Sequence, residues 1–398
     1  MNLLTVSYLG QKLGELGWAS AGVVFQYDPA FIATHHELSP FHLPLRAGAQ
    51  MRDGGRLPGL FEDSLPDAWG TRVMREWFRQ EKIPATTITP LTMLAYVGAR
   101  GMGALTYEPS TELEAESDHE IALVKIHEAV VAAGEAGAID LTELALVGSS
   151  AGGARPKALL ALPRDGSGPI LAGAGEIPDD HEAWLVKFDL SRDGSAGPIE
   201  EAYALMARAA GIDLPETRLL ETKSGKKIRQ HFAVRRFDRE GPQRIHHHTL
   251  AAMSHVGGGD LNYETLLRVA RRLTHDEAEV WRAYRRAVFN VLANNRDDHG
   301  KNHGFIYRDK KWTLGPAYDL TFVSPANQPE RGMSLAGERQ KADQSHLLKL
   351  AASEALDRRR AESVIEEVSA AIRRWRDFAD QAKVPALPAA EIQALLKV

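Results

Sequence analysis

The sequence predicts an α+β protein with a strand-rich first part, a mixed middle part and a helical last part. Short extended runs bounded by Gly and Pro fill the first hundred or so residues, strands and a helix alternate up to residue 244, and long helical patterns follow. Hydrophobic residues make up 44% of the 398 residues and charged residues 25%, which excludes a mainly disordered chain.

The first domain is expected at 1–108, because a polar, acidic stretch at 109–120 reads as a linker or an exposed helix start. Its expected elements, in chain order, are strands at 6–9 and 23–27, a turn-rich segment at 57–70, helical spacing at 71–78, and a glycine-rich piece at 97–107 that ends in a strand.

The second domain is expected at 120–244. Three runs, 158–162, 184–188 and 232–237, have the apolar character of strands. Between them, apolar residues recur at helical spacing over 200–212, and Gly211 provides the stop.

The third domain is expected at 245–398 and is mostly helical. Val280, Tyr284, Val288 and Val291 form one face of a helix over 276–295. A second long amphipathic helix is expected over 353–382. A strand-rich small lobe followed by a helical large lobe is the layout of a kinase-like fold.

Composition excludes several kinds of chemistry. The sequence contains no cysteine, so disulfides, thiolate zinc sites, iron–sulfur clusters and cysteine nucleophiles are ruled out. A net charge of −5 argues against a surface devoted to nucleic acid. The first residues lack the pattern of a signal peptide, and no apolar run is long enough to span a membrane, so a soluble cytoplasmic protein is expected.

The segment N-R-D-D-H-G-K-N at 295–302 carries the first chemical signal. Asp297 and Asn302 have the D-x4-N spacing of a protein-kinase catalytic loop, in which the Asp accepts the proton of the substrate hydroxyl and the Asn holds magnesium. By itself this spacing also fits a polar loop of caps and turns.

A second signal lies in G-P-A-Y-D-L at 315–320, after a hairpin expected from strands at 303–307 and 312–314. Asp319 stands just beyond the second strand, where the kinase D-F-G element places its magnesium-binding Asp. The alternative is an ordinary Asp in a turn at a strand end.

Lys187 gives the third signal, because it lies in an otherwise apolar strand and burying an unpaired ammonium is costly. A kinase uses such a lysine to hold nucleotide phosphates, often paired with a helix Glu. Glu200 is the preferred partner, with Glu201 next to it. The alternative is a solvent-facing residue on an edge strand.

The fourth signal is the loop V-G-S-S-A-G-G-A-R-P-K at 147–157. Gly148, Gly152 and Gly153 let backbone N–H groups converge on an anion. The loop matches neither the Walker A pattern nor G-x-G-x-x-G, but it lies one strand before Lys187, where a phosphate-covering loop is expected. Together the signals follow the order of a protein kinase, whose catalysis is mostly positioning and charge neutralisation.

The sequence resembles the HipA-type toxins, which are bacterial serine/threonine kinases of toxin–antitoxin systems. The resemblance implies a bilobal, protein-kinase-like fold with an N-terminal strand-rich accessory subdomain. It extends over nearly the whole chain and rests on these segments: L-P-G-L-F-E-D-S-L-P-D-A-W-G (57–70), S-S-A-G-G-A-R-P-K (149–157), V-K-F (186–188), R-R-F-D-R (235–239), R-D-D-H-G-K-N (296–302) and Y-D-L (318–320).

The resemblance implies ATP and Mg²⁺ as cofactors. Asp297 would be the catalytic base, and Asn302 and Asp319 would be magnesium ligands. Lys187 would bind phosphates, and Arg235 to Phe237 would contact the adenine. The full set of implied nucleotide contacts is Ala151, Gly152, Gly153, Ala154, Arg155, Lys157, Lys187, Glu200, Arg235, Arg236, Phe237, His299 and Lys301.

The resemblance also implies regulation and partners. Ser150, or the adjacent Ser149, would be autophosphorylated, which would expel the loop and switch the kinase off. The alternative is a serine that merely hydrogen-bonds in the loop. The substrate would be a serine in an aminoacyl-tRNA synthetase, often the glutamyl enzyme, so that translation stalls and growth arrests in a persistent state. A HipB-like antitoxin would neutralise the toxin, and DNA would be bound only through that antitoxin.

Two other classes remain open: a phosphotransferase for a small metabolite, and a non-catalytic component of a DNA-binding repressor complex. Metal sites elsewhere are not expected. Asp297, Asp298 and His299 are consecutive and cannot all face one ion on regular structure. His246, His247 and His248 would alternate faces in a strand.

Overall fold

The computed structural model describes residues 3–111, 122–135, 144, 155–173, 175–224 and 227–398. Most of the expected linker at 109–120 and most of the loop at 147–157 lie outside these residues. The predictions for Gly148, Ser149, Ser150, Ala151, Gly152, Gly153 and Ala154 therefore lie outside the described residues.

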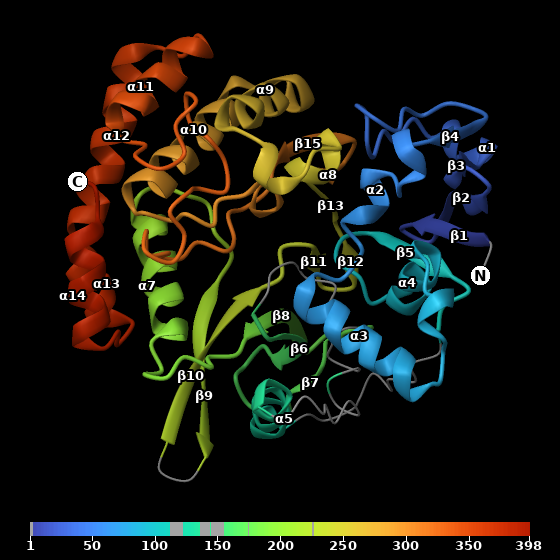
Figure 1. Ribbon diagram of the computed structural model, residues 1–398, viewed down its shortest axis with the longest axis horizontal. Coiled ribbons are helices and arrows are strands. Elements are labelled where there is room, and N and C mark those ends of the chain that lie inside the picture. Colours follow the sequence, from blue (N-terminus) through green and yellow to red (C-terminus); the bar gives the residue numbers. More distant parts are fainter. Residues whose placement is uncertain (1–2, 112–121, 136–143, 145–154, 174, 225–226) are drawn as a thin grey trace.

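A five-stranded antiparallel sheet, with the order β4-β3-β2-β1-β5, forms the N-terminal unit (Figure 1). Alternate residues of β1, Leu4, Val6 and Tyr8, are buried, as expected for a sheet with one covered face. The elements are β1 (Leu3–Tyr8), β2 (Gln11–Ala19), β3 (Gly22–Tyr27), α1 (Pro29–Ile32), β4 (Ala49–Met51), η1 (Asp53–Gly55), α2 (Gly59–Glu62), α3 (Ala68–Gln80), η2 (Ala85–Thr87), α4 (Pro90–Val97) and β5 (Leu105–Glu108).

The two predicted N-terminal strands and the helical spacing at 71–78 are confirmed as β1, β3 and α3. Helix α4 was not predicted. Its signal is present in the sequence: Thr89 caps the helix from a capping box, and Pro90 occupies the first helical position.

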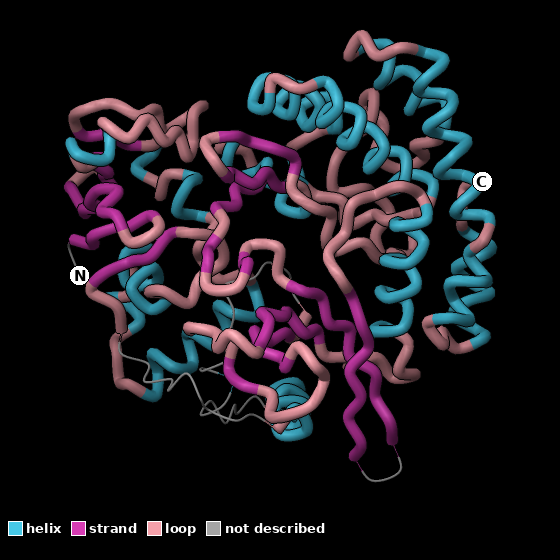
Figure 2. The backbone as a smooth tube through the Cα atoms, turned by 180° about the vertical axis from the view of Figure 1, so that it is seen from behind, coloured by secondary structure: helices cyan, strands magenta, loops and turns pink. Residues whose placement is uncertain are grey.

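A second antiparallel sheet, with the order β7-β6-β8-β10-β9, contains the three strands predicted in the middle region. Helix α7 packs against β9 and β10, and the hairpin of these two strands projects from the body of the molecule (Figure 2). The elements are α5 (Leu123–Glu135), β6 (Lys157–Pro163), β7 (Leu171–Ala172), β8 (His181–Lys187), α7 (Ala196–Ala209), β9 (Thr217–Ser224) and β10 (Lys227–Arg235).

The last part of the chain is mostly helical, as predicted, and contains a three-stranded sheet with the order β13-β14-β15 (Figure 1). A two-stranded sheet, β11-β12, precedes it. The elements are β11 (Arg239–Glu240), β12 (Gln243–Arg244), β13 (His246–Thr249), α8 (Leu250–Ser254), η3 (Gly258–Asp260), α9 (Tyr263–Thr274), α10 (Glu277–Leu292), η4 (Gly300–Asn302), β14 (Gly304–Arg308), β15 (Lys311–Leu314), α11 (Gln344–Ser353), α12 (Arg358–Arg373), α13 (Trp375–Gln381) and α14 (Ala386–Leu395).

The predicted helix at 276–295 is confirmed as α10, and the four residues of its apolar face are fully buried. The prediction of one long helix over 353–382 is wrong. Ala355 has a left-handed backbone, with φ of 56°, and Asp357 caps a new helix by accepting a hydrogen bond from the Arg360 amide. A second break near Arg374 turns Trp375 into the core, where its ring lies 5.5 Å from that of Tyr203. Burial of the indole outweighs the cost of interrupting the helix.

The N-terminal unit packs against both other parts of the molecule. One hydrophobic core is continuous from its sheet, for example Phe25, to α10, for example Phe289. A second core joins α3, through Val73, to the middle sheet, through Leu160 and Trp184. The N-terminal unit therefore shares its hydrophobic cores with the rest of the molecule. None of the described helices combines the length and hydropathy that crossing a bilayer requires.

Candidate functional site

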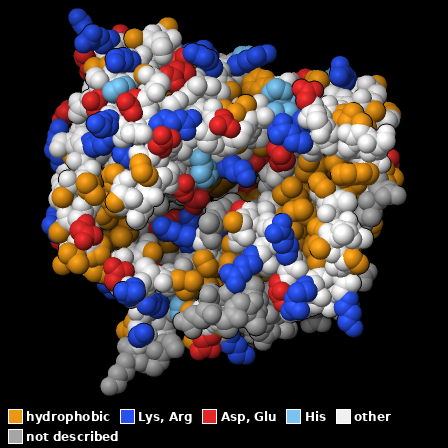
Figure 3. All heavy atoms as spheres, in the orientation of Figure 1, with side chains coloured by type: hydrophobic (Ala, Val, Ile, Leu, Met, Phe, Trp, Pro, Cys, Tyr) orange, Lys and Arg blue, Asp and Glu red, His pale blue; other side chains and the backbone are white. Residues whose placement is uncertain are grey.

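A cavity of about 330 Å³ lies where the middle sheet, the catalytic-loop segment and the N-terminal unit meet. Figure 3 shows a hollow near the middle of one face, with Lys, Arg, Asp, Glu and His side chains gathered around it. Nine residues named from the sequence line the cavity: Lys187, Glu200, Arg235, Arg236, Phe237, His299, Lys301, Asn302 and Asp319.

Lys187 ends β8, and its ammonium forms ion pairs with Glu200 of α7 and with Asp319. Its side chain is 9% exposed. Burial alone would lower the pKa of Lys187, but the two carboxylates outweigh this effect and raise the pKa, so the ammonium stays charged. Glu200 lies in the second turn of α7, because the helix starts at Ala196, four residues earlier than expected. The ammonium of Lys187 thus connects β8, α7 and the segment after β15.

Asp319 has a left-handed backbone, with φ of 53°. This conformation is uncommon for a residue other than glycine and is more often found where function requires it. Burial favours the neutral carboxyl, but Lys187 and Lys157 outweigh it and lower the pKa of Asp319 to about 2. The carboxylate is therefore ionised at neutral pH.

The catalytic-loop segment runs from the end of α10 to β14. Asn294, with φ of 56°, ends the helix, and the loop then brings Asn302 back towards Asp297. Asn302 Nδ2 donates to the backbone oxygen of Asp297 over 2.7 Å. His299 Nε2 lies 3.8 Å from Asp297 Oδ1. Burial raises the pKa of Asp297, and His299 acts in the opposite direction.

Asp298 points to the other side of the loop. It is fully buried, pairs with Arg331 and accepts a hydrogen bond from the Tyr263 hydroxyl over 2.6 Å. This arrangement agrees with the expectation that the three consecutive ligand-type residues at 297–299 do not face one ion.

The opposite end of the cavity is aromatic. The Phe237 ring stacks on Tyr318 at 5.7 Å and meets His247 edge-on at 5.1 Å. Arg236 is buried and donates to Asp238, over 2.9 Å and 2.8 Å, so its charge is already paired. A flat, apolar ring is the kind of group that this end of the cavity can hold.

The N-terminal unit supplies a wall that sequence reasoning missed, lined by Glu62, Asp63, Leu65, Asp67, Ala68 and Met102. Asp63 accepts hydrogen bonds from His248 Nδ1 and from the Thr249 amide and hydroxyl, each over 2.7 Å, and so ties the unit to the C-terminal part. The signal was the segment at 57–70, which the sequence singled out without assigning a role to its acidic residues.

Within the described part of the chain, three other predicted site residues do not line the cavity: Asp297, Arg155 and Lys157. Arg155 is half-exposed and pairs with Glu200 over 3.4 Å. Lys157 is buried and pairs with Asp67 over 3.1 Å.

The histidine run also follows its expected geometry. His246 and His248 are buried on one side of β13, and His247 faces the cavity on the other side. Across the described part of the chain, no group of three or more His, Asp or Glu side chains is arranged to hold a metal ion by itself.

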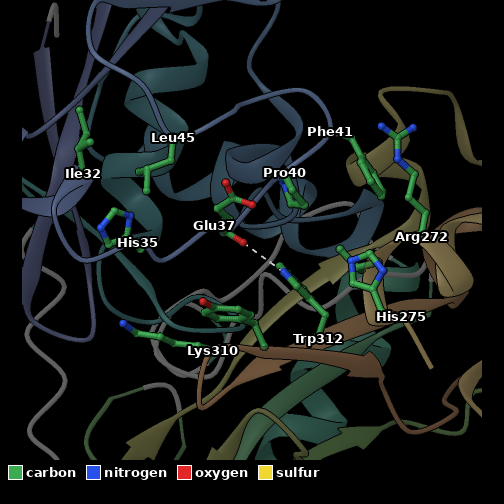
Figure 4. Close-up of a pocket in the computed structure, with 12 residues that line it drawn as sticks. Ile32, His35, Glu37, Pro40, Phe41, Leu45, Arg272, His275, Lys310 and Trp312 are labelled. Atoms are coloured by element: carbon green, nitrogen blue, oxygen red, sulfur yellow. Dashed lines mark hydrogen bonds between the residues drawn. The ribbon is translucent and has the colours of Figure 1, made fainter.

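A larger cavity, of about 660 Å³, lies between the N-terminal unit and α9 (Figure 4). Ile32 and Leu45 face Arg272 and Trp312 across it, whereas Phe41 lies beside Arg272, whose guanidinium carbon is 5.0 Å from the centre of the Phe41 ring. The Trp312 indole donates to the backbone oxygen of Glu37. None of the residues named from the sequence lines it. Size alone therefore does not select the site, and the smaller cavity holds the groups suited to phosphate chemistry.

The smaller cavity suits a magnesium–nucleotide complex. Mg²⁺ prefers carboxylate and amide oxygens and is commonly bound by only one or two carboxylates together with substrate phosphates. Asp319 and Asn302 supply such groups, and Lys187 supplies a cation for phosphates. His299 Nδ1 is buried without a hydrogen-bond partner in the described structure, so a polar donor or acceptor is left for a ligand.

Comparisons with known proteins agree with this layout. Residues 4–108 match the family model described as the HipA N-terminal domain, and residues 149–375, more than half of the chain, match the HipA-like C-terminal domain. A Sinorhizobium fredii protein named "Putative kinase Y4dM" is 29% identical over 252 residues, which are 60% of this chain and 57% of that protein. A Haemophilus influenzae protein named "Putative kinase" is 30% identical over 141 residues, which are 32% of this chain and 41% of that protein. The chain thus spans about half the length of these relatives.

The fold is shared with a chain of the Shewanella oneidensis HipA–HipB–operator DNA complex. The TM-score is 0.69 at 16% identity, and the match covers 98% of this chain and 94% of that chain. The expected bilobal fold, with a strand-rich N-terminal unit and a helical C-terminal lobe, is confirmed. On the two family models and this shared fold, the chain belongs to the HipA family.

Proposed function

We propose that the protein is an ATP- and Mg²⁺-dependent serine/threonine protein kinase. The observation that carries the proposal is the meeting of Lys187, Glu200, Asn302 and Asp319 at one end of a single cavity, next to Asp297. These are the residue types that a kinase uses for phosphates, metal and the substrate hydroxyl.

Each residue has a role that its surroundings support. Lys187, kept charged by its carboxylate partners, binds nucleotide phosphates. Asp297 orients the attacking hydroxyl and accepts its proton, and the bond from Asn302 to its backbone holds it in place. Phe237 and the segment from Arg235 onwards contact the adenine at the aromatic end.

Asn302 and Asp319 would hold the metal, with Glu200 keeping Lys187 in position. When bound, magnesium neutralises charge on the phosphates during transfer. His299, Lys301, Arg155 and Lys157 complete the proposed nucleotide contacts of the described residues, and Ala151 to Ala154 belong to the proposed phosphate-covering loop.

We further propose the biological setting. The HipA-like domains and the presence of HipB and operator DNA in the Shewanella complex support a toxin that a HipB-like antitoxin neutralises, with DNA bound through the antitoxin. The proposed target is an aminoacyl-tRNA synthetase, and Ser150 is the proposed site of inactivating autophosphorylation. Domain limits of 1–108, 120–244 and 245–398 fit this scheme.

Transfer of labelled phosphate from ATP tests the proposal. With Mg²⁺, the wild-type protein should label itself or a protein serine, and Asp297→Gln should reduce the rate by about 10²–10⁴ because the positioned base is lost. Circular dichroism should show that the variant is folded. Equal labelling by wild type and Asp297→Gln would contradict the assignment.

The phosphate-transfer assay and a growth assay on expression separate the other two classes. Labelling of a small metabolite without any protein acceptor would identify a metabolite phosphotransferase. Growth arrest that is equally strong with Asp297→Gln would show that any toxicity does not come from kinase chemistry, as expected for a non-catalytic repressor component.

A further inference from the structure

Two lysines lie side by side on the middle sheet. In the ladder between β6 and β8, Lys157 is directly opposite Lys187. Residues opposite each other on neighbouring strands project from the same face, so their ammonium groups repel unless each has a counter-charge. Lys187 has Glu200 and Asp319. Lys157 has Asp67, to whose Oδ2 its Nζ donates over 3.1 Å.

Asp67 comes from the N-terminal unit. It caps α3 by accepting a hydrogen bond from the Gly70 amide over 3.0 Å, so the helix start holds its carboxylate in place. Two residues on, Trp69 Nε1 donates to the backbone oxygen of Lys157 over 3.2 Å. The first turn of α3 therefore holds both the side chain and the backbone of Lys157.

The carboxylate stands between the lysine and the cavity. Asp67 lines the cavity, whereas Lys157 does not, and the side chain of Lys157 is only 1% exposed. The positive charge of Lys157 still lies close to the phosphate end, because Lys157 is directly opposite Lys187, which pairs with Asp319. A phosphate group at that end would be a competing anionic partner for Lys157.

We propose that Asp67 is a positioning residue that withholds Lys157 from the cavity, so that nucleotide phosphates compete with the N-terminal unit for this lysine. The inference rests on the proposed nucleotide binding and adds that the N-terminal unit sets the affinity. Adenosine has no phosphate, so its affinity should not depend on this competition.

Calorimetry on the full chain tests the proposal, with a non-hydrolysable ATP analogue plus Mg²⁺ and, separately, with adenosine. Asp67→Asn should bind the ATP analogue roughly tenfold more tightly, because the competing charge is gone, and should bind adenosine unchanged. Asp67→Glu should remain close to wild type. Asp53→Asn, the same change at an exposed position of the N-terminal unit, is the matched control and should have no effect.

A double-mutant cycle with Lys157→Met separates release of the lysine from simple repulsion between Asp67 and phosphate. In the Lys157→Met background, Asp67→Asn should no longer tighten binding of the ATP analogue. The same tightening in both backgrounds would overturn the proposal, as would unchanged or weaker binding by Asp67→Asn alone. Failure of wild type to bind the analogue would instead overturn the proposed nucleotide binding.

A measurement on the wild-type protein covers the case in which Asp67→Asn does not fold. When the ATP analogue draws Lys157 away, the first turn of α3 should loosen, and amide hydrogen exchange at residues 68–72 should become faster. Adenosine should leave this exchange unchanged. Slower or unaltered exchange with the ATP analogue would contradict the competition.

Discussion

The two sides of the loop at 295–302 differ sharply, although the neighbouring residues Asp297 and Asp298 carry the same kind of side chain. On the side of His299, the Asp297 side chain is 51% exposed, and its Oδ1 lies 3.8 Å from His299 Nε2. On the core side, Asp298 is 0% exposed and is held by Arg331, by the Tyr263 hydroxyl and by the Gly332 amide. The same residue type therefore occupies the proposed catalytic position on one side of the loop and anchors the loop on the other.

The ion pair between Asp298 and Arg331 explains how this loop can keep a defined shape. Arg331 is fully buried and also donates to the backbone oxygens of Asn290 and Val291, at the end of α10, and of Asn295. Because Asn290 and Val291 lie in the last turn of α10, the guanidinium ties the loop to the end of this helix. The position of Asp297 thus depends on the buried ion pair that its neighbour Asp298 forms with Arg331.

The largest expected effect that sharpens this comparison is on stability. Asp298→Asn should lower the free energy of unfolding by about 3–5 kcal/mol, because it leaves the buried Arg331 guanidinium without its counter-charge. Asp297→Asn should change it by no more than about 0.5 kcal/mol. Urea denaturation of both variants measures the free energy of unfolding. Similar decreases for the two variants would contradict the proposal that Asp298 anchors the loop and Asp297 does not.

A smaller effect is expected in the pH dependence of phosphate transfer. Because burial raises the pKa of Asp297, kcat/KM should fall as pH drops through that raised pKa, while Asp319, with a pKa of about 2, stays ionised. His299→Gln should move the acid limb to higher pH, since His299 lowers the pKa of Asp297. An acid limb that moves to lower pH would show that Asp297 is not the titrating base.

As the pH falls, the ionisation of these two carboxyls changes the free energy of unfolding in opposite directions. The depressed pKa of Asp319 contributes stability that is present above the ordinary pKa of Asp and is lost as pH falls towards about 2. The raised pKa of Asp297 favours the protonated folded form, so its unfavourable contribution is relieved as pH falls through that pKa.

The smallest effect is expected at an exposed ion pair on α12. Arg358 Nε lies 2.9 Å from Glu362 Oε1, with side chains 80% and 48% exposed. Glu362→Gln should change the free energy of unfolding by no more than about 0.5 kcal/mol and leave phosphate transfer unchanged. A loss as large as that of Asp298→Asn would show that burial is not what separates structural from surface pairs here.

Local patterns predicted the long helix α10 and about half of the strands, but not β2 or β9, because only alternation and helical spacing are visible without knowledge of contacts. They failed where tertiary contacts override spacing. The region 353–382 has continuous amphipathic character, yet the core draws in Trp375 and the helix breaks. The order of Lys187, Asp297, Asn302 and Asp319 along the chain was likewise visible in the sequence, although their catalytic and binding roles stay predictions.

The sequence by itself determined the fold class, the family resemblance and the residue types of the candidate site, since these depend on periodicity and on order along the chain. Only the tertiary structure decided that Asp298 faces the core and that Asp67 forms an ion pair with Lys157. It also decided that residues of the N-terminal unit line the cavity. Those outcomes depend on which charges can share a buried space, and residues 90 positions apart in sequence, such as Asp67 and Lys157, meet only after folding.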